Sequence, residues 1–288
     1  MDRSVSRRTT LLIMVIPTLG VMAGLSTLAA GGPSAAGLSD AEIEKVLSKG
    51  KITRTQDIGT GVTEPMRLWI ERDGITVSAS FKDVDFEKRG VTRFSGGDAE
   101  LNFTDSYQYE RAAYLLDREL GLEMVPVTVI RQVYRNPGAV TLWIGDSLTE
   151  AERAEEGLRP PDLSDLIYQQ ADMRIFDALI YNTDRHAANQ LYTPEDWKLH
   201  LIDHSRAFRT LGELPESFTD QPMTISHSLL ARLEALSEQQ LQKALKRELG
   251  PKRIKSILTR RDLILEKLEK DRAEYGDTFA FREEDRVP

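Results

Sequence analysis

Two stretches of alternating apolar and polar residues lie in the first half of the chain, after residue 50. Each stretch contains runs joined by turn residues, Asp73-Gly74 in the first stretch and Asn136-Pro137-Gly138 in the second. A period of two predicts strands with one buried face, and such turn residues predict hairpins. The predicted strands are 51–55, 66–72, 75–84, 125–134 and 139–144.

Between these stretches, residues 86–104 are mostly polar and contain three glycines, Gly90, Gly96 and Gly97. Glycine within a polar segment favours turns over regular structure. We therefore expect a loop or an insertion at this position.

Several segments have apolar residues at helical spacing, and in two of them typical capping residues mark where a helix begins or ends. Ser39 and Glu42 form a capping-box pair at the start of a helix predicted over 38–50, and Gly121 ends a helix predicted over 105–120. Ile167 and Ile175 are expected on the apolar face of a further helix. The remaining predictions are an acidic loop at 145–161, a helix at 166–181, a short buried strand at 197–202 and two or more amphipathic helices within 226–275.

This order of elements predicts an α+β chain with a small β-rich lobe followed by a larger helical lobe. We place the two lobes at residues 37–145 and 146–288. A cleft between two such lobes is a common place for a ligand site.

Residues 1–36 are typical of an export signal. Basic residues precede the apolar run 11–30, and small residues follow it, ending in Ser34-Ala35-Ala36. Ser6-Arg7-Arg8 also resembles a twin-arginine signal. We expect cleavage, and the alternative is an uncleaved anchor, because a run of about 20 residues can span a bilayer. Either way the rest of the chain is expected outside the cytoplasm, as a periplasmic, secreted or lumenal protein.

Composition narrows the classes of function. The chain has 38 basic and 46 acidic residues, a formal net charge of −8, and no cysteine. An acidic chain offers no general attraction to phosphate backbones, so we expect no nucleic-acid partner. The absence of cysteine excludes thiol nucleophiles, disulfides and cysteine-ligated metal centres.

The densest cluster of polar residues lies at 182–189 and continues at 199–203. It contains the carboxylate Asp184, the carboxamide Asn189 five residues later, and a second carboxylate, Asp203, at the end of a predicted strand. This set suits phosphoryl transfer from ATP to a hydroxyl group. Asp184 would take or orient the hydroxyl proton, while Asn189 and Asp203 would hold Mg²⁺ or Mn²⁺ against the triphosphate.

The runs DRHAAN at 184–189 and LIDHSRAF at 201–208 resemble the catalytic and metal-binding loops of atypical kinases. These comprise phosphoinositide-type lipid kinases, HipA-type kinases and the secretory-pathway kinases of casein-like proteins. Asn182, two residues before Asp184, is most similar to the secretory-pathway pattern. The resemblance covers about residues 50–270 in the order of parts. It implies a two-lobed protein-kinase-like fold with a β-rich N-lobe and a mainly helical C-lobe.

The resemblance extends upstream to Lys82 and Glu110, which match the phosphate-contacting lysine and its helix partner. Elementary chemistry gives the same roles, since a lysine on a strand can neutralise phosphate oxygens and a glutamate on a neighbouring helix can hold it. Taken singly, Lys82 is more typical of an edge or surface lysine and Glu110 of a solvated helix residue. Their order along the chain with Asp184, Asn189 and Asp203 favours the functional interpretation.

Two further segments could contact the nucleotide. Gly59-Thr60-Gly61 could bind phosphates through backbone N–H groups, or could form a plain turn. The backbone of Thr141–Gly145 lies where the resemblance expects the adenine to bind, although a core strand would have the same pattern.

Arg185 and His186 are expected to be structural. A buried pair between Arg185 and an aspartate would orient the catalytic loop, and His186 would pack under the metal site. The residues after Asp203 depart from the usual Phe-Gly, because His204 and Ser205 follow it.

Three other functions remain open at this point, and one of them is nucleotidylation of a target with ATP bound in the opposite sense. A pseudokinase or nucleotide-binding module would keep the fold without turnover. A metal-dependent phosphoesterase could use Asp184, Asp203, His186, His200 and His204, but His200 and His204 flank a strand end and suit zinc poorly. The favoured prediction is an atypical kinase that uses ATP and phosphorylates a hydroxyl acceptor, most simply Ser or Thr of a protein. A glycan or lipid acceptor stays possible, and a membrane partner is expected only through an uncleaved N-terminal segment.

Overall fold

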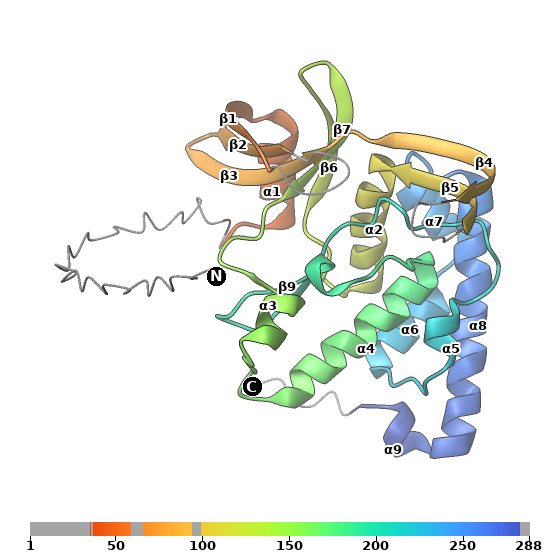
Figure 1. Cartoon of the computed structure of the whole chain (residues 1–288). Helices are drawn as coiled ribbons and strands as arrows, with labels where there is room; N and C mark the ends of the chain where they lie inside the picture. The colour runs from red at the N-terminus through yellow and green to blue at the C-terminus, as the bar shows by residue number, and fades with distance from the viewer. Residues whose placement is uncertain (1–34, 36, 59–65, 94–98, 283–288) are drawn as a thin grey trace, which may run out of the picture. The chain divides into compact units, whose positions relative to one another are not determined.

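The structure is a computed structural model, and it describes residue 35 and residues 37–58, 66–93 and 99–282 (Figure 1). These residues belong to one compact unit. The export segment predicted for residues 1–36, apart from Ala35, lies outside the described residues, and so do Gly59 and Gly61. The division into lobes after residue 145 stays a prediction.

A five-stranded antiparallel sheet forms the first half of the unit, in the order β1-β2-β3-β7-β6. Alternate residues of its central strands, such as Leu68, Val77 and Phe81, are buried, and helix α1 packs over this face. Helix α2 packs beside β6 and β7. The elements are α1 (Asp40–Lys49), β1 (Lys51–Asp57), β2 (Met66–Arg72), β3 (Ile75–Lys82), α2 (Tyr107–Leu120), β6 (Thr128–Val133) and β7 (Asn136–Leu142).

The predicted start of α1 is confirmed. The Ser39 side chain accepts a hydrogen bond from the Glu42 backbone N–H, and the Glu42 carboxylate accepts one from the Ser39 N–H. Gly121 ends α2 in the left-handed conformation, with φ of 64°. Local signals were therefore sufficient to predict both helix ends.

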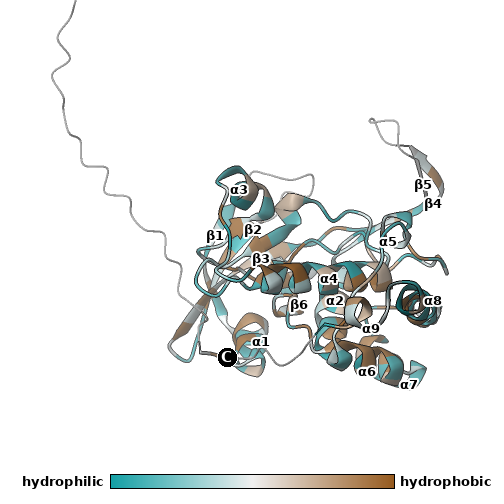
Figure 2. Ribbon diagram, turned by 90° about the horizontal axis from the view of Figure 1, so that it is seen from below, coloured by the Kyte–Doolittle hydropathy of each residue, from teal (hydrophilic) through white to brown (hydrophobic). Residues whose placement is uncertain are grey.

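Of the two alternatives expected at 86–104, the structure has an insertion and not a plain loop. Residues Asp85–Arg93 form β4 and Ala99–Ser106 form β5, an antiparallel hairpin inserted between β3 and α2. Phe86 and Val91 of this hairpin are exposed, so no regular apolar face marks it in the sequence. Both views place the hairpin on the side of the unit that carries helix α8 (Pro251–Tyr275) (Figure 1, Figure 2).

The turn predicted at Asn136-Pro137-Gly138 was also misplaced. Strand β7 already begins at Asn136, and the turn residues are Tyr134 and Arg135, both at positive φ. Two successive left-handed residues match the tight hairpin turns that follow strand twist.

The second half is mostly helical, as predicted. The 145–161 connector is not a plain loop, because it contains β8 and α3. On α4 the prediction for Ile167 was wrong, since it is 57% exposed while Leu166 is buried. The elements are β8 (Leu148–Thr149), α3 (Glu150–Glu155), α4 (Leu163–Ile180), η1 (Ala187–Asn189), β9 (Gln190–Tyr192), β10 (Leu199–Leu201), α5 (Glu216–Thr219), α6 (His227–Ala235), α7 (Glu238–Leu245), α8 and α9 (Asp277–Ala280).

Arg260 of helix α8 is completely buried and joins three parts of this half. Its guanidinium donates to the backbone carbonyls of Leu179, Arg209 and Leu211. Burial lowers the pKa of Arg260 to about 10, so the group stays charged at neutral pH. Within the part of the chain that the structure describes, none of the helices is both long and apolar enough to cross a membrane.

Candidate active site

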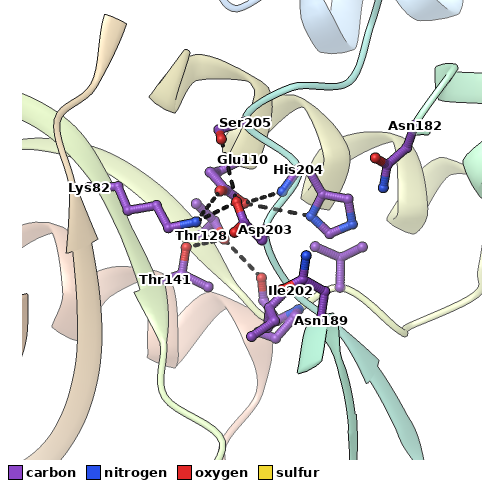
Figure 3. A network of polar contacts seen from close by, with 12 residues as sticks. Lys82, Glu110, Thr128, Thr141, Asn182, Asn189, Ile202, Asp203, His204 and Ser205 are labelled. Atoms are coloured by element: carbon purple, nitrogen blue, oxygen red, sulfur yellow. Dashed lines mark hydrogen bonds and ion pairs between the residues drawn. The ribbon is translucent and has the colours of Figure 1, made fainter. Parts of the chain in front are cut away.

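Lys82, Glu110 and Asp203 come together from three separate elements (Figure 3). Lys82 is the last residue of β3, Glu110 lies in the first turn of α2, and Asp203 follows β10. The Lys82 Nζ lies 3.0 Å from Glu110 Oε1 and 2.7 Å from Asp203 Oδ1. The two carboxylates thus share one ammonium group.

Electrostatics keeps Lys82 and Glu110 of this cluster ionised. Burial alone would lower the pKa of Lys82, but the carboxylates of Glu110 and Asp203 outweigh burial and raise it. Burial alone would raise the pKa of Glu110, but Lys82 and hydrogen bonds from His204 outweigh burial and lower it. Lys82 therefore carries a positive charge that can bind the oxygens of a phosphate group placed near it.

His204 contacts both Glu110 of this cluster and Arg185 of the neighbouring loop. Its backbone N–H donates to Glu110 Oε2 at 3.1 Å, and its Nε2 lies 3.0 Å from Nη2 of Arg185. The imidazole is completely buried, and burial lowers its pKa. His204 therefore fixes Glu110 and Arg185 relative to each other.

The loop after α4 is held by the Arg–Asp pair that the sequence predicted. Arg185 binds the Asp177 carboxylate through two nitrogens, at 2.9 and 3.0 Å, and donates to the carbonyls of Asn189 and Ile202. Asn182 donates to Asp177, and its Oδ1 accepts from the Asp184 N–H at 3.1 Å. The backbone around Asp184 is thus positioned by a buried polar network.

Asn189 and Asp203 lie beside each other at the ends of two paired strands. Asn189 immediately precedes β9, Asp203 is separated from β10 by Ile202, and the Ile202 N–H donates to the Asn189 carbonyl at 3.2 Å. Asn189 donates through Nδ2 to the Asp184 carbonyl, which leaves Oδ1 as a free acceptor with respect to the described residues. Asp203 has φ of 62°, a left-handed conformation that is uncommon outside glycine and recurs at functional sites.

The Asp184 carboxylate faces an arginine. Arg206 Nη1 lies 3.0 Å from Asp184 Oδ2, and its guanidinium lies over the Phe103 ring of β5, 5.1 Å from the centroid. Arg206 lies within the run LIDHSRAF, and no role was predicted for it. Its position three residues after Asp203 is the only signal that the sequence carries.

A second residue that sequence reasoning missed is Asp105. We predicted it as the first residue of a helix, but it belongs to β5, and α2 begins at Tyr107 after Ser106 as N-cap. Its carboxyl lies close to Ser205, Asp203 and Lys82, and burial raises its pKa. Its Oδ1 is buried without a hydrogen-bond partner among the residues that the structure describes.

Aromatic and arginine side chains stack on the face of the sheet that carries Lys82. Arg67 pairs with Ser80 across β2 and β3, so the two share a face with Lys82 two residues later. The Arg67 guanidinium lies between Trp69 and Trp143, 4.9 and 4.4 Å from their ring centroids. This stack was not predicted, because the sequence does not show which strands are neighbours.

The segment expected to contact adenine is only partly strand, since β7 ends at Leu142. The Trp143 N–H donates to the Ser78 carbonyl at 2.9 Å. The next donor and acceptor, the N–H of Ile144 and the C=O of Trp143, form no hydrogen bond with any described residue. Both are therefore available to a ligand.

The histidines do not form a metal centre. His186 is exposed and accepts from the Ala188 N–H, so the prediction that it packs under a metal was wrong. His200 lies on β10, where burial lowers its pKa to about 4. Among the described residues, no three His, Cys, Asp or Glu side chains form a group that could hold a metal. This arrangement does not support the phosphoesterase alternative.

The strand order, the helix that carries Glu110 and the helical half that follows define a protein-kinase-like α+β fold. No protein-family model matches the sequence, and the sequence comparison with curated proteins finds no match. Solved structures do match. Hydra Fam20 with sugar has a TM-score of 0.65 at 17% identity, covering 89% of this chain and 97% of that one.

The Golgi casein kinase is similar as well. One of its structures has a TM-score of 0.61 at 16% identity and covers 84% of this chain and 77% of that one. Another, with Mn/ADP bound, has a TM-score of 0.60 at 16% identity and covers 83% and 77%. At such identities the likeness shows the fold, and the predicted atypical kinase fold is confirmed.

Proposed function

We propose that this chain is an atypical kinase that transfers the γ-phosphate of ATP to a hydroxyl group. The single observation that carries the proposal is the Lys82 ammonium, bridged between Glu110 and Asp203 from elements 28 and 121 residues away. A buried lysine held by a helix glutamate is the arrangement that binds nucleotide phosphates in kinases.

On the donor side, Lys82 would bind phosphate oxygens while Glu110 and His204 hold it in place. Asn189 and Asp203 would hold Mg²⁺ or Mn²⁺, which would neutralise the charge that develops on the transferred phosphoryl group. The donor set fits, because Asn189 Oδ1 and Asp203 Oδ2 are oxygen acceptors that bond to none of the described residues. A magnesium ion is commonly bound by one or two protein oxygens together with the nucleotide's phosphates.

The base would lie against the stacked face formed by Arg67, Trp69 and Trp143. The free C=O of Trp143 and N–H of Ile144 provide one acceptor and one donor for its edge. Flat rings favour stacking of a purine, and the two backbone groups orient it.

On the acceptor side, Asp184 would orient the attacking hydroxyl and take its proton as the new O–P bond forms and the bond to the leaving ADP oxygen breaks. Arg206, at 3.0 Å from Asp184, would place a positive charge near the transferred group. We propose Ser or Thr of a protein as the acceptor. Export through residues 1–36 would place the reaction outside the cytoplasm, as the similarity to a Golgi enzyme also supports.

The test is thermal unfolding of purified residues 37–288 with ATP and with Mg²⁺ or Mn²⁺. At a nucleotide concentration far above its Kd we expect a metal-dependent rise in Tm of about 5 °C. Asp203→Asn and Lys82→Met should each lose this rise relative to their own ligand-free Tm. Lys270→Ala, which removes an exposed lysine of α8, should keep it.

No rise in Tm with any nucleotide and metal would contradict the donor site. A rise without phosphoryl transfer to casein, peptides, glycans or lipids would favour the binding module without turnover. The two results separate a chain without a donor site from a nucleotide-binding module without turnover.

A further inference from the structure

The β4–β5 hairpin is inserted between the two residues of the donor side. Strand β4 begins at Asp85, shortly after Lys82, and β5 ends at Ser106, one turn of helix before Glu110. The hairpin forms a two-stranded sheet of its own, apart from the five-stranded sheet. Because an isolated two-stranded hairpin is at best marginally stable in water, contacts with the rest of the fold are expected to hold it.

The base of the hairpin contacts the segment that follows Asp203. The Ser106 N–H donates to the Ser205 carbonyl at 2.8 Å, at the end of β5. Earlier on the same strand, the Phe103 ring lies against the next residue of the segment, with the Arg206 guanidinium 5.1 Å from the ring centroid. One backbone bond and one side-chain contact therefore join β5 to this segment.

Arg206 is held between an aromatic ring and a carboxylate. Its guanidinium lies over Phe103, and its Nη1 is 3.0 Å from Asp184 Oδ2. The Arg206 side chain is 30% exposed and that of Asp184 is 43% exposed, and an ion pair at such exposure holds two side chains only weakly. A planar guanidinium also stacks on an aromatic face, which restricts the orientations open to it. The ring thus fixes a direction that the ion pair alone would leave loose.

The Phe103 ring is supported in turn from the other strand of the hairpin. Phe86 of β4 is opposite Asp105, so its ring is the diagonal neighbour of Phe103, and the two centroids are 6.0 Å apart. Diagonal aromatic pairs of this kind stabilise antiparallel strands. Phe86 itself is 51% exposed. The hairpin therefore carries an aromatic pair of which one ring faces Arg206.

We propose that Phe103 is a positioning residue, whose ring orients Arg206 toward Asp184. The inserted hairpin then joins the two sides of the site, because its ends adjoin Lys82 and Glu110 while its aromatic ring supports the arginine of the acceptor side. The inference rests on the proposed function and adds a role for the hairpin to it.

The first test follows the position of Arg206 and needs no turnover. It measures the rate at which phenylglyoxal modifies Arg206, by peptide mass spectrometry of the full chain. Phe103→Leu removes the ring and keeps an apolar side chain, so Arg206 should react several times faster than in the wild type. Phe103→Tyr keeps a ring and should restore the slow rate, and the matched Phe86→Leu should leave it nearly unchanged. Arg54, which lies over Trp69, is the internal reference and should react equally in all variants.

The second test measures phosphoryl transfer from ATP to casein, a peptide, a glycan or a lipid, whichever the wild type phosphorylates. Phe103→Leu should lower kcat by about 3–30-fold, the range that corresponds to one cation–π contact, and should leave KM for ATP unchanged. Phe103→Tyr should restore kcat. An unchanged nucleotide-dependent rise in Tm separates this loss from a loss of folding or of nucleotide binding.

Equal modification of Arg206 in the wild type and Phe103→Leu would overturn the proposal, and so would faster modification with unchanged kcat. An equal loss in Phe86→Leu would also overturn it, because the hairpin as a whole would then be responsible. If the wild type transfers no phosphate, the proposed function fails, whereas the modification rates still decide whether Phe103 orients Arg206.

Discussion

The candidate site has a donor side, which would bind the nucleotide, and an acceptor side, which would bind the hydroxyl substrate. The side chains of the two sides differ in their exposure to solvent and in the elements that carry them. On the donor side, the side chains of Lys82 and Glu110 are 17% and 6% exposed and come from a strand and a helix. On the acceptor side, the side chains of Asp184 and Arg206 are 43% and 30% exposed and come from loops. The lysine–glutamate pair of the donor side is part of the core, whereas Asp203, at 40% exposed, and the acceptor side face solvent.

This difference indicates that selectivity for the acceptor substrate depends on the exposed loops of the site. Groups that bind phosphate are fixed by the same packing that stabilises the fold, so they change little between substrates. Groups on exposed loops can change without loss of stability. Variants on the two sides should therefore separate nucleotide binding from acceptor phosphorylation.

The largest effect is expected from Asp184→Asn. The amide keeps the size of the carboxylate but cannot take a proton, so phosphoryl transfer should fall by about 10²–10⁴-fold. Nucleotide binding should be unchanged, because Asp184 lies on the acceptor side. Turnover and the nucleotide-dependent rise in Tm, measured on the same preparation, check both statements.

Asp184→Asn also changes the partner of Arg206, so Arg206→Lys serves as the control. It keeps a positive charge and should retain part of the activity. A parallel loss of nucleotide binding in Asp184→Asn would break the distinction between the two sides.

A smaller effect is expected on the donor side from Trp143→Ala. Loss of a stacking surface should weaken nucleotide binding by about tenfold. Trp143→Phe, which keeps a flat ring, should lose much less. Isothermal titration with ADP and Mn²⁺ measures both, and identical affinities in the two variants would remove Trp143 from the base site.

The order of the parts could be predicted from the sequence because the signals are local. Capping residues, period-two runs and the DRHAAN motif need no knowledge of distant segments. The β4–β5 hairpin escaped prediction because its apolar residues Phe86 and Val91 are exposed and form no regular apolar alternation. The Tyr134–Arg135 turn escaped because Pro137 and Gly138 nearby are stronger turn formers.

The pairing inside the candidate site depends on contacts that no local pattern contains. Lys82 and Asp203 are 121 residues apart, and their contact was not predicted. The resemblance to kinases indicated only that Glu110 is the partner of Lys82. Asp105 and Arg206 were missed for the same reason. Asp105 approaches Ser205, and Arg206 approaches Phe103, only because β5 and the segment after β10 pack together.

Helix α2 carries a second buried carboxylate, Asp117, in addition to Glu110. Asp117 allows the structural role of this helix to be tested apart from its role in nucleotide binding. Asp117 accepts from the N–H groups of Met124 and Val125 and contacts Arg118. Burial raises its pKa to about 6 despite these partners, in the opposite direction from Glu110.

The smallest effect is therefore expected from Asp117→Asn. A carboxyl whose folded-state pKa is raised adds stability at low pH and loses it as pH rises through about 6. The amide keeps an acceptor for both N–H groups and has no charge to bury. Between pH 4 and pH 7 the wild type should lose on the order of 1 kcal/mol relative to this variant in urea unfolding. Asp117→Ala, which removes the acceptor, should be less stable at every pH. Parallel stability curves for wild type and Asp117→Asn would contradict the shift, whereas an unchanged nucleotide-dependent rise in Tm would assign Asp117 to the framework alone.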